Sequence, residues 1–412
     1  MNPNLFKKAM WGLIAGSLFI HGYLFWKDRV QIVKGYPDFT IFYSAGLIVR
    51  EGLGHQLYSD ATQFQVQRSF APGVVIRQGP LPYNHPPFEA LIFVPFTFLS
   101  YTGAYVAWNL LNLGMLVLAA HRLRPQINFL KRKSLLLWLI GLLAFFPIAF
   151  GMLQGQDVIL LFLLQTLAFC ALKRKSYFAA GLWFGLGTFK FHLILAALIV
   201  IGLGWKKFKV FFGFLAACLS LGFLSLVMIG WREVVQYPSY VFRKERFMEQ
   251  EVILSSGMSN IRGLLEGWQL SGDLLQGLHL CTLIFSIALV LWAIVVSRKY
   301  LGKQPELCFA AVTCVSVLVS YHALVYDLIL LVIPLLINIG IIIEQETSWR
   351  QNLPVLLPLS VLLCSPLYAL MSFHLGHLNL LALAILLWLA GIWRQLKSGE
   401  KSEYLPAVVA AL

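Results

Sequence analysis

Apolar runs of about 15 to 24 residues recur from one end of this 412-residue chain to the other. Each run is long enough to cross the hydrocarbon core of a membrane, or most of it. Charged residues make up only 12% of the chain, about half the share expected of a soluble globular domain. These features exclude an ordinary soluble protein and predict an all-α polytopic membrane protein.

We expect about 12 transmembrane helices, within a range of about 10 to 13. The stretch 88–100 is too short to span without a strong tilt and contains Pro95, so we expect a re-entrant or surface-lying helix there. The expected spans are 9–26, 101–121, 134–153, 157–172, 177–189, 191–205, 208–230, 277–297, 305–320, 326–343, 353–371 and 377–393.

The net charge of +14 at pH 7 could indicate nucleic-acid binding, but its distribution favours a topological explanation. Most Lys and Arg residues lie in short connections that the expected spans place on one side, and most acidic residues lie on the other. By the positive-inside rule, both termini are cytoplasmic and two long loops, 27–87 and 231–276, face outward. Both loops mix aromatic, charged, Gly and Pro residues, which indicates folded loops with short surface helices.

The first apolar run could belong to a signal peptide, since Lys7 and Lys8 precede it, but no small-residue cleavage site follows. We therefore expect a retained membrane anchor. All six cysteines lie inside apolar segments and have no metal-like spacing. This pattern indicates small core residues, and neither disulfides nor a metal site.

The stretch 36–46, YPDFTIFYSAG, places one aspartate just after this anchor and before a short amphipathic helix. Asp38 could cap the helix, because aspartate accepts hydrogen bonds from the first backbone N–H groups. It could also act as a general base at the membrane surface, where nearby hydrocarbon solvates a carboxylate poorly. The sequence leaves both roles open, and one side chain can fill both.

Two further outward-facing stretches carry polar side chains. Asn84 and His85 precede two prolines, which indicates rigid loop geometry or the lining of a polar site. Lys190 and His192 lie in GLGTFKFHL, between two short expected spans that would form a hairpin with Lys190 at its outer tip. A lysine with apolar flanks either extends to the interface or has a function, such as binding an anionic phosphate.

The remaining candidates lie in the second half of the chain. Asn260 and Arg262 belong to MSNIRGLLEG, where the arginine could grip a phosphate or be an ordinary surface residue. His322 and Asp327 belong to SYHALVYDLILL, beside Tyr321, and could be interfacial anchors or part of a site. The sequence contains no nucleotide-binding loop, Ser-His-Asp pattern or metal-ligand cluster, so ATP hydrolysis and acyl transfer lack support.

The expected topology places residues from five separate segments on the outer side, namely Asp38, His85, Lys190, Arg262 and His322. A site built from them would combine a carboxylate, basic groups and neighbouring hydrocarbon. That combination suits a lipid-linked phosphate donor that arrives from the bilayer.

Six blocks stand in a distinctive order between residues 36 and 336: PDFTIFYSAG, YNHPPFEALIFVPFTFLSY, GQDVILLFLL, AAGLWFGLGTFKFHLIL, NIRGLL and SYHALVYDL. In this order and spacing they resemble family 87 of the glycosyltransferases, in the GT-C class. The resemblance implies a GT-C-type helix bundle, with a catalytic membrane module over 1–336 and further transmembrane helices and a cytoplasmic tail over 337–412. Members are similar to mannosyltransferases that use polyprenyl-phosphate-mannose at the bacterial inner membrane.

By this resemblance, Asp38 would take a proton from an acceptor hydroxyl, and Lys190, Arg262 and His322 would stabilise the leaving phosphate. Many relatives carry two adjacent acids at this point, whereas Asp38 has no acidic neighbour, so we expect an enzyme without metal or other cofactor. We expect further substrate contacts from Asn84, His85, His192 and Asn260, and positioning roles for Tyr43, Tyr321 and Asp327.

The expected activity is that of an inverting hexosyltransferase at the outer face of a bacterial inner membrane. It would move a sugar, with mannose as first candidate, from polyprenyl phosphate to a glycolipid or glycan hydroxyl, with membrane lipids and no nucleic acid as further partners. The alternative is a transporter or flippase of a lipid-linked sugar or phospholipid, which would also present basic residues to a headgroup. Such proteins often contain repeats and mid-membrane polar residues, and this chain has no obvious repeat.

Overall fold

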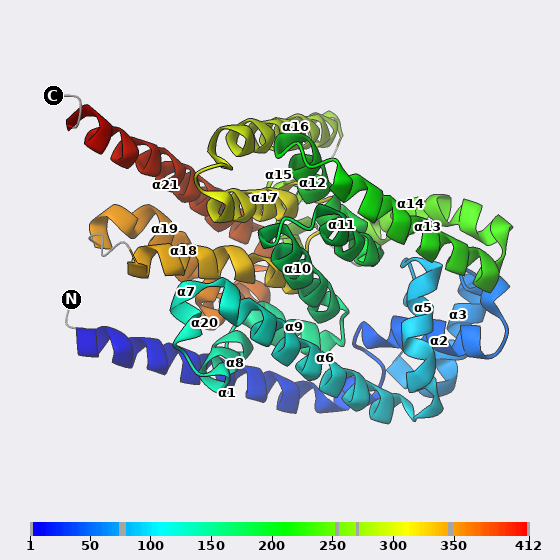
Figure 1. The fold of residues 1–412 in the computed structure, drawn as a ribbon. Coiled ribbons are helices and arrows are strands. Elements are labelled where there is room, and N and C mark those ends of the chain that lie inside the picture. Colours follow the sequence, from blue (N-terminus) through cyan, green and yellow to red (C-terminus); the bar gives the residue numbers. More distant parts are fainter. Residues whose placement is uncertain (1–2, 74–79, 252–254, 269–271, 345–348, 410–412) are drawn as a thin grey trace. The chain divides into compact units, whose positions relative to one another are not determined.

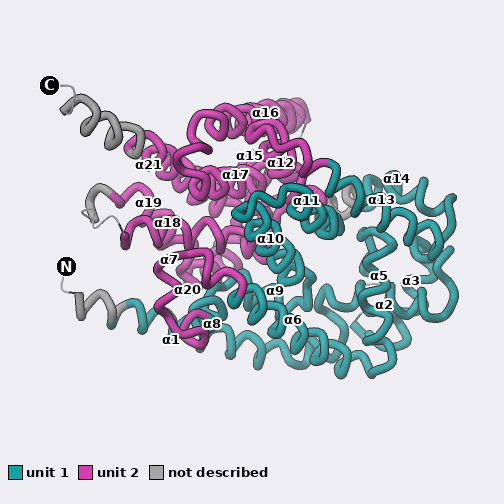
Figure 2. Tube along the Cα trace, in the orientation of Figure 1, with its two compact units in different colours: residues 1–121, 139–190, 212–254 teal, residues 122–138, 191–211, 255–412 magenta. Residues whose placement is uncertain are grey.

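The computed structural model describes residues 3–73, 80–251, 255–268, 272–344 and 349–409, and every regular element in these ranges is a helix (Figure 1). The predicted all-α fold class is therefore confirmed for the described residues. The chain forms two compact units, and each draws on several separate stretches of the sequence (Figure 2).

The first unit comprises residues 1–121, 139–190 and 212–254. It contains 3-10 turns at Gly54–Gln56, Val94–Phe98 and Thr188–Lys190. Its α-helices are α1 (Pro3–Val33), α2 (Phe39–Arg50), α3 (Asp60–Phe70), α5 (Pro87–Phe93), α9 (Phe146–Gln154), α10 (Val158–Lys173), α11 (Tyr177–Leu186) and α14 (Trp231–Glu251). Three helices run across the boundary of the two units: α6 (Tyr101–Leu123), α8 (Leu135–Leu143) and α13 (Lys209–Ile229).

The second unit comprises residues 122–138, 191–211 and 255–412. Its short elements include π-helical segments at Val200–Gly204 and Met371–Leu375 and 3-10 turns at Arg124–Gln126, Ser255–Gly257, Val325–Leu331 and Leu378–Leu380. Its α-helices are α7 (Asn128–Lys131), α12 (Phe191–Ile199), α15 (Ile261–Glu266), α16 (Asp273–Tyr300), α17 (Pro305–Val319), α18 (Val332–Glu344), α19 (Trp349–Leu363), α20 (Ser365–Leu370) and α21 (Leu381–Val409).

Five described helices are long and apolar enough to cross a membrane, or up to seven spans if each of two bent pairs counts as one. The bent pairs are 135–143 with 146–154 and 177–186 with 188–204. Helix α1 covers the expected anchor but is not among the five. The expected total of about 12 spans, their orientation and the division of the chain at 336 stay predictions. The five are Tyr101–Gln126, Lys209–Ile229, Asp273–Tyr300, Val325–Glu344 and Leu378–Ser398.

Two expected spans are broken in the structure: 134–153, where α8 and α9 meet at 71°, and 353–371. Helix α19 ends at Leu363, Cys364 leaves the helical region with ψ at 88°, and α20 begins beside Pro366. Proline fits the first turn of a helix but cannot continue the one before it, because it lacks an N–H group. The prediction of one continuous helix was therefore wrong at this proline.

Helix α2 lies at the centre of a group of helices in the first unit, and it is not the amphipathic surface helix that the sequence indicated. Ten consecutive residues, 39–48, are buried. Helix α3, helix α5 and the 3-10 turn that follows α5 all pack against it (Figure 1). A helix that other helices cover on all sides needs no polar face, so the polar and apolar pattern of its sequence does not predict which side is buried.

The 88–100 stretch forms α5 and the turn Val94–Phe98, a pair too short to span a membrane. It packs so closely on α2 that a Cβ atom at Gly46 would lie 2.9 Å from the Phe93 carbonyl carbon and 3.0 Å from Thr97 Cγ2. The guanidinium of Arg50 also donates a hydrogen bond to the Thr97 carbonyl. Packing on α2 therefore positions this stretch.

This packing predicts that Gly46→Ala destabilises the protein by about 1–3 kcal/mol, because the added methyl group overpacks the contact with Phe93. The matched control is Gly114→Ala in α6, where a Cβ atom would meet nothing within 4 Å. That change should leave stability unaltered or raise it by up to about 1 kcal/mol, since alanine favours the helix. Denaturant unfolding in detergent measures both, and equal effects would contradict the close packing.

Candidate functional site

A tight turn between α9 and α10, residues 154–157, organises the first unit. Gly155 ends α9 in the left-handed conformation, with φ at +63°. Two aromatic residues of α6 hold this turn: the Tyr105 hydroxyl donates to the Leu153 carbonyl at 2.8 Å, and the Trp108 indole N–H donates to the Gly155 carbonyl at 3.0 Å. The turn is thus fixed by hydrogen bonds from a neighbouring helix.

The first residue of α2 lies directly on this turn. A Cβ atom at Gly155 would lie 2.6 Å from Phe39 Cβ, so glycine is required both for its backbone conformation and for this contact. The contact brings Asp38 to the turn. Gln156 Nε2 donates to Asp38 Oδ2 at 2.7 Å, and the Asp38 backbone N–H donates to Gln154 Oε1 at 3.3 Å.

Asp38 occupies the N-cap position of α2, but its carboxylate makes no capping hydrogen bond to that helix. The capping role that the sequence left open is therefore contradicted by the structure. The N-cap residue has helical dihedral angles, φ −59° and ψ −20°, whereas capping side chains usually start from extended backbone. The half-buried carboxylate instead faces Gln156.

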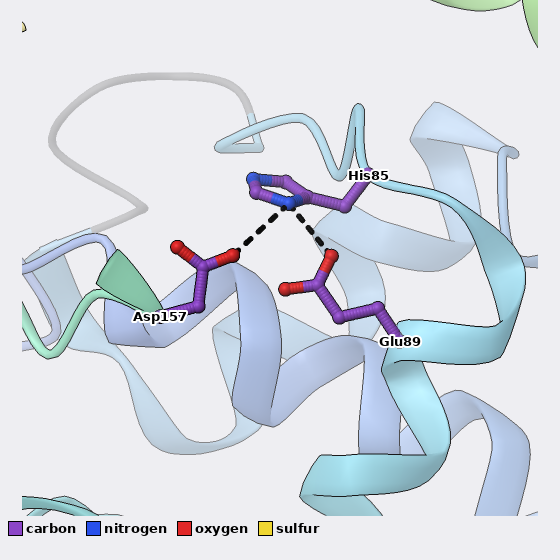
Figure 3. Close-up of side chains that lie close together, drawn as sticks. All are labelled: His85, Glu89 and Asp157. Carbon is purple, nitrogen blue, oxygen red and sulfur yellow. Dashed lines mark hydrogen bonds and ion pairs between the residues drawn. The ribbon is translucent and has the colours of Figure 1, made fainter. Parts of the chain in front are cut away.

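Asp157, the residue after Gln156, belongs to a cluster of ionisable side chains, and Figure 3 shows three of them, His85, Glu89 and Asp157. His85 Nδ1 is 2.8 Å from Glu89 Oε2 and 3.8 Å from Asp157 Oδ2. Lys190 Nζ approaches the other oxygen of this aspartate, Oδ1, at 3.5 Å. Both carboxylates are 1% exposed. Groups from three separate segments therefore share one small polar region.

Lys190 does not extend to the surface, which contradicts the alternative that it only snorkels to the interface. It is 6% exposed and pairs with Asp157. A buried ammonium group is stable only when an opposite charge compensates its lost hydration. Asp157 supplies that charge.

The apolar surroundings of Glu89 make its carboxyl group a weaker acid. Burial raises the pKa of Glu89 to about 7, while Asp157 and Lys190 act in the opposite direction. A buried carboxylate is poorly solvated, so its neutral form gains relative to its charged form. Any additional cation near Glu89 would favour the ionised form.

Sequence reasoning did not single out Glu89 or Asp157. Each is an acidic residue at the edge of an apolar stretch, which is a signal in itself, since such residues are costly unless paired. The partners could not be found by spacing, because the helices from α6 to α9 lie between Glu89 and Asp157 in the sequence.

The second unit contains its own polar group around Arg262. Its guanidinium is buried, pairs with Glu266 at 3.1 Å and lies 4.2 Å from the centre of the Tyr321 ring. Glu266 also accepts from Thr282 at 2.9 Å and lies 3.0 Å from His279 Nδ1. Arg262 is therefore not an ordinary surface arginine.

Two predicted site residues of this unit have clear structural roles. Asn260 caps α15 by accepting from the Gly263 N–H at 2.8 Å, and its amide donates to the Ser320 carbonyl at 2.7 Å. Asp327 accepts from the Leu324 N–H at 2.9 Å and so closes the start of its own 3-10 turn. These hydrogen bonds give Asn260 and Asp327 structural roles that do not require a bound substrate.

The remaining predicted residues are placed as follows. The rings of His192 and His322 are 6.2 Å apart. The Tyr43 hydroxyl donates to the Leu99 carbonyl at 2.8 Å, and the backbone of Asn84 accepts from the Tyr237 hydroxyl. The first unit thus contains Asp38, Tyr43, Asn84, His85 and Lys190, and the second contains His192, Asn260, Arg262, Tyr321, His322 and Asp327.

A family model for glycosyltransferase family 87 matches residues 83–325, more than half of the chain. The chain belongs to glycosyltransferase family 87. Neither a search of curated proteins nor one of solved structures found a match. The resemblance stated from the sequence is confirmed, and this family 87 protein is a membrane-embedded glycosyltransferase.

The matched region of the family 87 protein contains the charged cluster of His85, Glu89, Asp157 and Lys190. It begins after Asp38, whose place at the site therefore depends on the contact with residues 154–157. Family membership favours the transferase over the transporter alternative.

The contact between Gly155 and Phe39 predicts that Gly155→Ala lowers both stability and transferase activity. Gly52→Ala is the matched control, because Gly52 also has a positive φ, +76°, but nothing lies within 4 Å of its Cβ position. The control should cost about 1–2 kcal/mol for backbone strain alone. Gly155→Ala should cost more and should displace Asp38. Thermal unfolding and sugar transfer measure the difference, and identical results for both variants would contradict this role of the turn.

The buried pair of Lys190 and Asp157 predicts a large cost for Lys190→Gln, about 3–5 kcal/mol, because a buried carboxylate loses its nearest cation. The matched control is Lys244→Gln. Lys244 pairs with Asp60 at 2.6 Å, but this aspartate is 53% exposed, so the loss should be under about 1 kcal/mol. Unfolding by denaturant in detergent compares them. Similar small losses would show that water reaches the Lys190 site.

Proposed function

We propose that this family 87 glycosyltransferase is an inverting enzyme that uses a polyprenyl-phosphate-linked hexose, with mannose as the first candidate. The acceptor is a hydroxyl group of a glycolipid or glycan at the outer face of a bacterial inner membrane. The proposal combines family membership with one observation: Asp38, at the start of α2, has a half-buried carboxylate that is not used to cap its helix.

In this mechanism Asp38 is the general base. Its Oδ2 atom accepts a hydrogen bond from Gln156, which orients the carboxylate and supports its charged form. The carboxylate takes the proton of the acceptor hydroxyl as the acceptor oxygen attacks C1 of the sugar. The bond between C1 and the phosphate oxygen breaks, its electron pair leaves with the phosphate, and the configuration at C1 inverts. Phosphate leaves readily, so one base suffices and no general acid is needed.

The leaving phosphate gains negative charge in the transition state and needs nearby cations. In the first unit Lys190 is the candidate, since Asp157 places its ammonium next to the turn that carries Gln156. We assign a supporting role to His85, which contacts the same aspartate. Arg262 and His322, in the second unit, stay predicted phosphate contacts.

The decisive experiment is Asp38→Asn in purified protein, with polyprenyl-phosphate-mannose as donor and a panel of membrane glycolipids as acceptors. The amide preserves the size of the side chain and can still accept from Gln156, but it cannot take a proton. We expect transfer to fall by about 10²–10⁴-fold without loss of stability. The measurement is the rate of product formation, normalised to folded protein.

Asp60→Asn serves as the control, because Asp60 is an exposed aspartate in the same unit, paired with Lys244. It should retain the wild-type rate. Transfer by Asp38→Asn near the wild-type rate would overturn the role of Asp38. A stable wild-type protein that transfers nothing from polyprenyl-phosphate-mannose, but does so from another lipid-linked or nucleotide-linked sugar, would overturn the donor assignment.

A further inference from the structure

The cluster of His85, Glu89 and Asp157 has the composition of a metal site. One imidazole nitrogen and one oxygen from each carboxylate lie within 4.8 Å of one another (Figure 3). We infer that this cluster binds one divalent transition-metal ion. The inference is independent of the proposed donor and acceptor.

The distances between the donor atoms fit this assignment. Ligand atoms around an octahedral ion at about 2.1 Å lie about 3.0 Å apart when adjacent and about 4.2 Å apart when opposite. His85 Nδ1 lies 3.8 Å from Asp157 Oδ2, within this range, and 2.8 Å from Glu89 Oε2. A bound ion would replace the hydrogen bond between His85 Nδ1 and Glu89 Oε2, and the distance between these two atoms would increase slightly.

The carboxylate oxygens supply the second, independent observation. When both carboxylates are ionised, Glu89 Oε1 and both Oδ atoms of Asp157 are buried and accept no hydrogen bond from any described group. Buried acceptors normally have hydrogen-bond partners, because an unsatisfied one loses the hydration it had in the unfolded chain. Lys190 Nζ lies 3.5 Å from Asp157 Oδ1 and compensates that oxygen. Asp157 Oδ2, one of the proposed ligand atoms, and Glu89 Oε1 are left without a hydrogen bond, and these two oxygens point to a further cation.

Lys190 is compatible with the ion, because it uses a different oxygen. Its Nζ atom lies near Asp157 Oδ1, whereas Oδ2 is the oxygen near His85. A lysine on the outer oxygen keeps the carboxylate ionised and orients it, as groups around a metal site commonly do for the ligands themselves. When both carboxylates are ionised and His85 is neutral, one lysine leaves the cluster with a net negative charge, which favours a further cation.

The donors are also held on rigid backbone. His85 is followed by Pro86 and Pro87, and Glu89 lies one turn later on α5. Asp157 occupies the N-cap position of α10, yet its side chain makes no cap to that helix. An aspartate at this position usually caps its helix, so its orientation toward His85 is an exception that a ligand role explains.

The donor types narrow the ion. Imidazole suits Zn²⁺ and other transition metals, whereas Mg²⁺ and Ca²⁺ prefer oxygen ligands alone. A mixed set of one imidazole and two carboxylates therefore favours Zn²⁺ or Mn²⁺. This inference replaces the expectation of a metal-free enzyme, which considered only acids adjacent to Asp38 in the sequence.

The test uses the full-length protein, purified in detergent with a tag that contains no histidine, stripped with EDTA and titrated with ZnCl₂ or MnCl₂. Bound metal is measured by mass spectrometry after gel filtration, and the thermal midpoint is followed in parallel. We expect about one ion per chain and a higher midpoint, since a ligand that binds only the folded state stabilises it. Wild-type protein that binds no stoichiometric metal up to millimolar concentrations would overturn the inference.

Glu89→Gln and Asp157→Asn should each weaken binding by more than about tenfold. The control is Glu266→Gln, which changes another buried carboxylate next to a histidine ring, His279, without altering the cluster. It should retain the metal. Equal binding by all three variants would place the ion elsewhere and overturn the assignment. Because binding is measured without substrates, a failed transfer assay would not affect this result.

Discussion

The close contact between Gly155 and Phe39 is the constraint on which the candidate site depends. A left-handed glycine ends α9, and the absence of a Cβ atom lets α2 begin directly against the turn. Asp38 immediately precedes Phe39, and Gln156 and Asp157 immediately follow Gly155. A single contact between the Gly155 backbone and the Phe39 side chain therefore sets the positions of two carboxylates. Tyr105 and Trp108 of α6 hold the turn by hydrogen bonds, so the geometry does not rely on the glycine alone.

Around this turn, the apolar character of the unit forces charged groups together. A buried ion is stable only with compensating charge or hydrogen bonds, and α5, α10 and the 188–190 turn each contribute one or two such groups. The resulting cluster is compact, but its carboxylate oxygens have more acceptor capacity than the neighbouring donors fill. Such a cluster can bind a further cation. Asp157 directly follows Gln156, the residue that holds the proposed base, Asp38.

Much of this architecture could be predicted from residue types and their order. Long apolar runs predicted helices, and the order of six blocks predicted the family. Asp38, His85 and Lys190 were identified because polar residues with apolar flanks are costly and usually serve a purpose. The predictions failed where a residue's role depends on a distant partner. Helix α2 is buried by helices that follow it in the sequence. The Asp38 carboxylate accepts a hydrogen bond from Gln156 and does not cap α2. Pro366 was visible in the sequence, but its effect on the expected span 353–371 was underestimated.

The sequence by itself determined that the chain is helical, largely membrane-embedded and a member of glycosyltransferase family 87, because hydropathy and block order are properties of the chain read in one dimension. Only the tertiary structure decided that Glu89 and Asp157 meet at His85 and that Lys190 is buried against them. These contacts join residues far apart in the chain. Their energies come from burial and from charge pairing in space, which local patterns do not encode.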